Sequence, residues 1–171
     1  MHAGDIHREP PTSAMSETVG DLFDTIVSKP ATIPDHATLR DAVDAILDSG
    51  LTRKAYVVDA DEHLKGTITI ETLMRHVAYR LGARPPGIVS WFRFLRGMES
   101  DAATDLMAKP VPVTRATPIG EIVRRVVEEH LNDFPVVDEA GRLIGEVNTH
   151  SLLKATRGVF STSDGDASHG P

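Results

Sequence analysis

The sequence repeats itself, and this constrains the fold more than any other feature. Lys29-Pro30 recurs as Lys109-Pro110, and Val57-Val58-Asp59 recurs as Val136-Val137-Asp138. The second motif recurs one position sooner than the first, so copy two carries a single deletion between them. A unit of roughly 55 residues is too short to bury its apolar face well alone, so the two copies are expected to share a core. The sequence therefore predicts one pseudo-symmetric body with a cleft between its halves.

Each copy has the same expected order of elements: a short strand, a helix, a β-hairpin and a closing helix. In copy one, apolar residues follow the i, i+3, i+4, i+7, i+8 spacing from Leu39, and in copy two they follow it from Ile119. This spacing indicates helices with one buried stripe. The hairpins are expected over 56–69 and 134–148, and the closing helices over 71–81 and 150–156.

Three sequence signals predict where helices begin. Thr38 with Asp41 three residues later predicts a capping box. Thr117 before Pro118 predicts an N-cap followed by proline at the first helical position. A further helix is expected over 17–27, where apolar residues gather on one side.

The repeat divides the chain into five segments. They are a flexible N-terminal arm over 1–16, a first repeat over 17–82, an insert over 83–101, a second repeat over 102–158 and a flexible tail over 159–171. The insert carries Trp91, Phe92 and Phe94 in a chain with only 5% aromatic residues. These rings either pack back onto the core as an inserted helix or form a surface for self-association or partner docking.

Composition excludes several classes of function. The absence of cysteine rules out disulfides, thiolate metal sites and a cysteine nucleophile. A net charge of -7 argues against nucleic-acid binding. The sequence shows no signal peptide and no apolar run long enough to span a bilayer, so a cytoplasmic, non-transmembrane protein is expected. No metal-ligand spacing, nucleophile elbow or phosphate-binding P-loop is present, so neither a metal site nor catalysis is expected.

The ordered set of motifs resembles the CBS domain, named after cystathionine β-synthase. Lys-Pro-x-x-(Ile/Val), an amphipathic helix, Val-Val-Asp and Leu-x-Gly-x-(Ile/Val) occur twice in the same order. The two copies together resemble a CBS pair, also called a Bateman module. The resemblance implies an α/β (α+β) fold of tandem β-α-β-β-α repeats paired about a pseudo-twofold axis. It also implies two ligand clefts, a regulatory rather than enzymatic role, and a homodimer that meets through helices.

The resemblance also implies which residues line each cleft. In copy one they are Thr32, Ile33, Pro34, Tyr56, Val57, Thr69, Glu71 and Thr72, and in copy two they are Val111, Val113, Phe134, Pro135, Asn148, His150 and Ser151. Tyr56 and Phe134 are expected beside the base. The family's signature places a Thr or Ser hydroxyl three residues before an Asp that holds the ribose. Thr69 keeps the hydroxyl, but Thr72 replaces the Asp, and Asn148 and Ser151 replace both residues in copy two.

Two functional hypotheses follow. The first is a ligand-sensing module that requires no cofactor, binds AMP, ADP, ATP or another adenosyl compound, and signals to a regulated protein that the sequence does not identify. Thr69 and Tyr56 favour it, and copy one is the better candidate site. The alternative is a dimeric interaction scaffold with degenerate clefts, which the missing Asp favours. Glu146 and His150 bracket the copy-two cleft and are expected to give binding a pH dependence.

Overall fold

The computed structural model describes residues 17–50, 52–81 and 101–162. The predicted arm over 1–16, the aromatic residues of the insert and the end of the predicted tail lie outside the described residues. Within the described part, no helix combines the length and the hydropathy needed to cross a membrane.

Two small sheets have the same internal topology, as the repeat predicts. The first has the order β2-β3-β4, and the second has the order β1-β7-β6-β5. In each, a short parallel strand joins an antiparallel hairpin, so β2 and β3 correspond to β5 and β6. The strands are β1 (Val27–Ser28), β2 (Thr32–Pro34), β3 (Lys54–Val58), β4 (Leu64–Thr69), β5 (Val113–Thr114), β6 (Asp133–Val137) and β7 (Leu143–Asn148).

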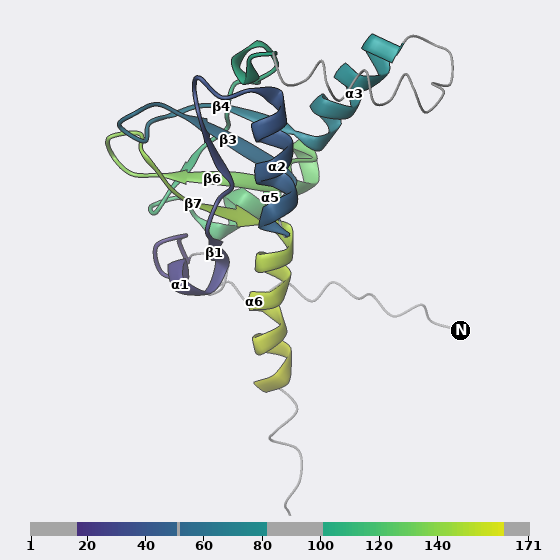
Figure 1. Cartoon of the computed structure of the whole chain (residues 1–171). Coiled ribbons are helices and arrows are strands. Elements are labelled where there is room, and N and C mark those ends of the chain that lie inside the picture. Colours follow the sequence, from purple (N-terminus) through teal and green to yellow (C-terminus); the bar gives the residue numbers. More distant parts are fainter. Residues whose placement is uncertain (1–16, 51, 82–100, 163–171) are drawn as a thin grey trace, which may run out of the picture.

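The helices complete the predicted β-α-β-β-α order twice, as β2-α2-β3-β4-α3 and β5-α5-β6-β7-α6 (Figure 1). They are α1 (Phe23–Ile26), α2 (Leu39–Ser49), α3 (Ile70–Leu81), the 3-10 turn η1 (Ala103–Asp105), α5 (Ile119–Glu129) and α6 (Thr149–Thr162). The predicted fold class and both hairpins are confirmed.

One predicted helix start is confirmed, and the other is wrong by one residue. Thr38 caps α2: its hydroxyl accepts from the Asp41 amide at 3.3 Å, and the Asp41 carboxylate accepts from the Thr38 amide at 2.8 Å. In copy two the N-cap of α5 is Pro118, which is extended and makes no side-chain cap bond. The Thr117 hydroxyl instead accepts from the Thr114 amide at 3.0 Å, which stabilises the turn before the helix.

The helix predicted over 17–27 is mostly absent, because tertiary hydrogen bonds replace helical ones. The amide of Val19 donates to the carbonyl of Thr117 at 2.9 Å, and that of Gly20 donates to Arg115 at 2.7 Å. Only the short α1 is helical within this segment. The segment therefore belongs structurally to copy two, although it precedes copy one in sequence.

Each repeat sends its leading segment onto the sheet of the other repeat. Strand β1 pairs with β7, where Ser28 lies opposite Glu146. In the reciprocal bridge, Ala108 lies opposite Thr67, with main-chain hydrogen bonds of 2.8 and 3.0 Å. The repeat relates these two pairs, since Ser28 corresponds to Ala108 and Thr67 corresponds to Glu146. The exchange makes the two repeats one interlocked body.

The core is divided in two, which corrects the expectation of a single shared core. One cluster lies around the first sheet and the other around the second. The exchanged segments contribute to both: Ala103, with Leu106 and Met107 packed beside it, joins the copy-one cluster. Val19 and Ile26 join the copy-two cluster. Each core is thus built from both repeats, so neither repeat completes its own core.

Candidate functional site

Two cavities lie where the first residues of β3 and β6 approach the ends of β4 and β7. The larger, about 380 Å³, is lined by residues 50, 52–53, 132–133 and 148–150. The smaller, about 170 Å³, is lined by residues 53–54, 69, 71 and 130–133. Arg53, Asn132 and Asp133 line both. Only the larger reaches the size range typical of small-molecule sites, which begins at about 300 Å³.

Arg53 and Asn132 hold equivalent positions in the two copies. The Arg53 carbonyl accepts from the amide of Ile70 at 3.0 Å, and the Asn132 carbonyl accepts from the amide of Thr149 at 2.9 Å. These bonds tie the start of each hairpin to the first residue of the helix that follows it. Because both residues line both cavities, the pseudo-twofold axis passes between them.

A buried carboxylate is hydrogen-bonded to two residues that line the larger cavity. Glu146 is 1% exposed and accepts from the hydroxyl of Thr52 at 2.8 Å and from the side-chain amide of Asn148 at 3.3 Å. Tyr56 is also fully buried, and its hydroxyl makes no hydrogen bond to a described residue. Burial, and then the charge of Glu146, raise the pKa of Tyr56 above its usual range. The sheet interface is therefore polar rather than apolar.

Lys54 and Asp133 are a second equivalent pair, and they meet across the axis. The Lys54 ammonium donates to the main-chain carbonyl of Asp133 at 2.8 Å and lies 3.8 Å from its carboxylate. Both side chains are largely buried, at 15% and 9% exposure. Burial raises the pKa of Asp133, and the nearby Lys54 charge only partly offsets this effect.

Two predicted ligand residues cap helices. The Thr69 hydroxyl accepts from the amide of Thr72 at 3.1 Å, and the Asn148 carbonyl oxygen accepts from the amide of Ser151 at 2.8 Å. These are the bonds of N-cap residues to α3 and α6. Thr72 and Ser151 therefore contribute main-chain amides to the caps, and neither lines a cavity.

The structure brings only part of the predicted site to the cavities. Thr69 and Glu71 line the smaller, and Asn148 and His150 line the larger. The cavity sizes thus favour the copy-two end, whereas the sequence favoured copy one. The other predicted residues line neither cavity. Four of them lie in the two cores: Ile33, Val57, Val113 and Phe134. Three are exposed, namely Thr32, Pro34 and Val111, and two are buried, namely Tyr56 and Pro135.

The predicted pairing of Tyr56 with Phe134 is wrong by one residue. Tyr56 lies opposite Thr67, and in copy two the residue opposite Glu146 is Pro135. Tyr56 therefore corresponds to Pro135, while Phe134 points into the copy-two core. The Val-Val-Asp motif, which directly follows Tyr56 and Pro135, is the sequence signal that identifies the correct partner.

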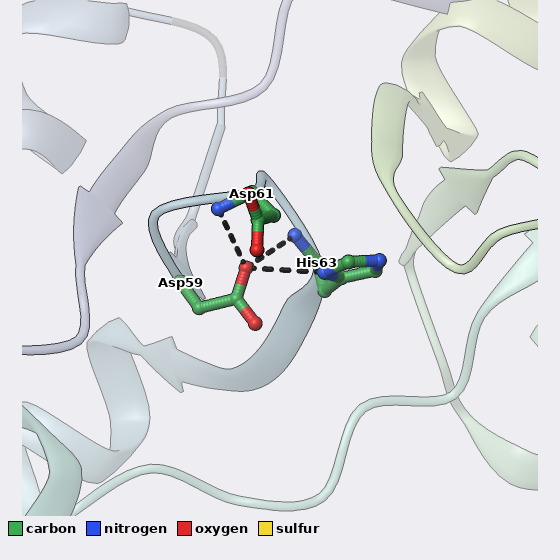
Figure 2. A group of neighbouring side chains, drawn as sticks. All are labelled: Asp59, Asp61 and His63. Atoms are coloured by element: carbon green, nitrogen blue, oxygen red, sulfur yellow. Dashed lines mark hydrogen bonds and ion pairs between the residues drawn. The ribbon is translucent and has the colours of Figure 1, made fainter.

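A group of two carboxylates and an imidazole outside the cavities resembles a metal site. Asp59, Asp61 and His63 lie close together in the β3–β4 turn. Figure 2 shows the Asp59 carboxylate directed into the turn, where it accepts from the amides of Asp61 and His63 at 3.0 and 2.9 Å. In copy two, Asp138 accepts in the same way from Ala140 and Arg142 at 2.9 and 2.8 Å. The repeated aspartate of Val-Val-Asp thus stabilises the hairpin turn.

This structural role predicts different effects for the two carboxylates of the turn. Asp59→Ala should lower the melting temperature by a few degrees, whereas Asp61→Ala should leave it unchanged, because only Asp59 holds main-chain amides. These amides lower the pKa of Asp59, so its stabilisation is present above the unfolded pKa and is lost as the pH falls through the folded pKa. Thermal melts at about pH 7 and pH 3 test this. Equal effects of the two variants, appearing only with added divalent cations, would contradict it.

Comparison with known families identifies the repeats. The sequence profile of the CBS domain matches residues 3–79 and 103–158, which is more than half of the chain. The chain therefore belongs to the CBS domain family, whose members are generally regulatory modules rather than catalytic ones. A comparison with curated protein sequences finds no significant match.

Solved structures agree with this assignment. A CBS domain-containing protein from Thermotoga maritima is 26% identical over 82% of this chain and 94% of its own, with a TM-score of 0.64. CBSX2 in complex with AMP is 19% identical over 84% of this chain and 98% of its own, also with a TM-score of 0.64. The cytosolic domain of the Mg²⁺ channel MgtE in complex with ATP is 21% identical over 84% and 50%, with a TM-score of 0.60.

Proposed function

We propose that this chain is a non-enzymatic regulatory module that binds an adenine nucleotide or a related anionic ligand between its repeats and signals to a partner protein. The observation that carries this proposal is the position of Arg53. It lines both cavities, and no described carboxylate lies within ion-pair distance of its guanidinium. A guanidinium in this situation is suited to bidentate binding of a phosphate.

Two similar structures support a nucleotide as the ligand class, because they contain AMP and ATP. In this chain, bound ligand would contact both repeats at once, since each cavity has walls from copy one and copy two. Ligand binding would therefore change the relative stability of alternative arrangements of the two halves, to the extent that it prefers one of them. The regulated partner and the cytoplasmic location remain predictions.

A thermal-shift panel of AMP, ADP and ATP tests the ligand. A nucleotide at 100 times its dissociation constant adds about 2.7 kcal/mol, which should raise the melting temperature by roughly 5–10 °C. Arg53→Gln should abolish the shift, while Arg75→Gln, an exposed arginine outside both cavities, should preserve it. Thr69→Ala is a poorer probe because it removes a helix cap as well. Flat responses to all three nucleotides would overturn the proposal.

The alternative function, a dimeric scaffold, is favoured by exposed apolar side chains at equivalent positions of α2 and α5. Leu47 is 71% exposed, and its counterpart Val127 is 67% exposed. Val123 on α5 is also exposed. A second copy that presents the same surface would bury these side chains in a twofold interface.

Leu47→Asp/Val127→Asp is therefore expected to convert a dimer into a monomer. Light scattering coupled to size exclusion measures the mass. Leu153→Asp on α6 is the matched control, because it places the same charge at a similarly exposed leucine on another helix. A wild-type chain with the mass of a monomer would contradict this proposal.

A further inference from the structure

The larger cavity has a lining unlike that of an adenine pocket. The described residues that line it are glycine, threonine, asparagine, aspartate, arginine and histidine, and these include no aliphatic side chain. The aliphatic residues of the nearby strands, such as Ile33 and Val57, are occupied in the hydrophobic core. A purine base gains its binding energy from apolar and stacking contacts. This lining offers hydrogen bonds and charge instead.

Two opposite charges face this cavity from different repeats. Arg53 immediately precedes β3, and Asp133 is the first residue of β6. An anionic ligand would be attracted by the first and repelled by the second. A ligand accommodated by both must carry an anionic group and, at some distance from it, hydrogen-bond donors.

The Asp133 carboxylate is available to such donors. It is 9% exposed, and no described residue donates a hydrogen bond to it. The close contact of Lys54 is with the main-chain carbonyl at 2.8 Å, while its distance to the carboxylate oxygen is 3.8 Å. Its oxygens are not among the buried unpaired polar atoms of the described residues, so they reach the surface of the cavity. A ligand hydroxyl can therefore donate to this carboxylate in place of water.

The other acidic side chains near the interface do not compete for this role. The Glu146 oxygens already accept from Thr52 and Asn148, and Glu146 does not line the cavity. Glu71 lines only the smaller cavity. Asp133 is the one carboxylate among the described residues that line the larger cavity.

We propose that the larger cavity recognises the sugar-phosphate part of its ligand and not the base, with Arg53 binding the phosphate and Asp133 accepting from the sugar hydroxyls. This inference rests on the proposed function, since it assigns the ligand class of the same site. A carboxylate has enough lone pairs to accept from two neighbouring hydroxyls. Asn132 supplies a further neutral donor and acceptor for the sugar.

Calorimetric titrations with AMP, ribose 5-phosphate and 2-deoxyribose 5-phosphate test the proposal. AMP and ribose 5-phosphate should bind the wild-type chain with affinities within about threefold of each other, since the base adds little. Removing the 2-hydroxyl should weaken binding roughly tenfold, because a hydrogen bond to a charged acceptor is lost. Asp133→Asn should reduce this ratio to near one, while Asp61→Asn, which changes an exposed carboxylate outside both cavities, should leave it unchanged. A ratio measured within one variant is insensitive to a general loss of stability.

The outcomes separate this inference from the proposed function. If AMP binds and ribose 5-phosphate does not, the nucleotide proposal stands and the sugar-phosphate assignment is overturned. If the wild-type chain does not distinguish ribose 5-phosphate from its 2-deoxy form, or Asp133→Asn retains the discrimination, the role of Asp133 is overturned. If none of the three ligands binds, both proposals fail. The wild-type comparison decides even if Asp133→Asn does not fold.

Discussion

Gly66→Ala is expected to lower the free energy of unfolding by about 3 kcal/mol, the upper part of the range for an overpacked core. Gly66 lies on β4, where the segment exchanged from copy two crosses the strand. A methyl group on Gly66 would lie 2.8 Å from both Cβ and Cγ of Met107. Since the main chain fixes Cβ, rotation of the methionine side chain cannot relieve this overlap. The bridge between Thr67 and Ala108 would have to open.

Urea denaturation followed by far-UV circular dichroism measures the effect. Lys65→Ala is the control, because it changes an exposed neighbour whose surface ion pair is worth about 1 kcal/mol or less. The equivalent residue in copy two, Gly145, offers a sharper comparison. A methyl group there would overlap Cγ1 of Val27 but would lie at ordinary contact distance, 3.7 Å, from its Cβ. Val27→Ala should therefore rescue Gly145→Ala, whereas Met107→Ala should not rescue Gly66→Ala. Rescue in both copies, or in neither, would contradict the exchanged arrangement.

Much of the fold is predictable from the sequence because its signals are local. The stripes that begin at Leu39 and Ile119 determine α2 and α5, and the Thr38–Asp41 box marks where α2 begins. The exchange of segments is not predictable in this way. The amides of Val19 and Gly20 bond to copy two, and this tertiary preference overrides the helical pattern of their own segment. Sequence periodicity carries no information about such partners.

The candidate site also has a part that is predictable from local sequence signals and a part that is not. The repeat leads to Thr69 and Asn148, because each stands at a fixed distance after a motif glycine. Asp133 belongs to no motif, so the sequence does not predict that it lines the cavities. When the two Val-Val-Asp motifs are aligned, Asp133 is the residue equivalent to Lys54. In a pseudo-twofold body, equivalent residues near the axis contact each other. Here one of them, Lys54, is a cation and the other, Asp133, is an anion.

Lys54→Met should lower the free energy of unfolding by about 3 kcal/mol at pH 7.5, because it leaves the Asp133 carboxylate buried without its cation. Methionine keeps the aliphatic stem of lysine, so little packing is lost. Lys54→Met/Asp133→Asn should recover most of the loss, since no unpaired charge then remains in the interface. Urea titrations of the three proteins measure these differences. A double variant as unstable as Lys54→Met would contradict the role of the pair.

The loss caused by Lys54→Met should also shrink as the pH falls. In the folded protein the pKa of Asp133 is raised above 3.8 by burial, and Lys54 holds it down, so removing Lys54 raises it further. The folded variant then binds a proton at a pH where the unfolded chain does not. The stabilisation that this proton gives the folded variant is fully present below the unfolded pKa of Asp133. It is lost as the pH rises through the folded pKa. The difference between wild type and Lys54→Met should therefore be smaller at pH 5 than at pH 7.5, whereas that between wild type and the double variant should change less. An equal loss from Lys54→Met at both pH values would mean that the Asp133 carboxylate is solvated and that its charge does not face a dry interface.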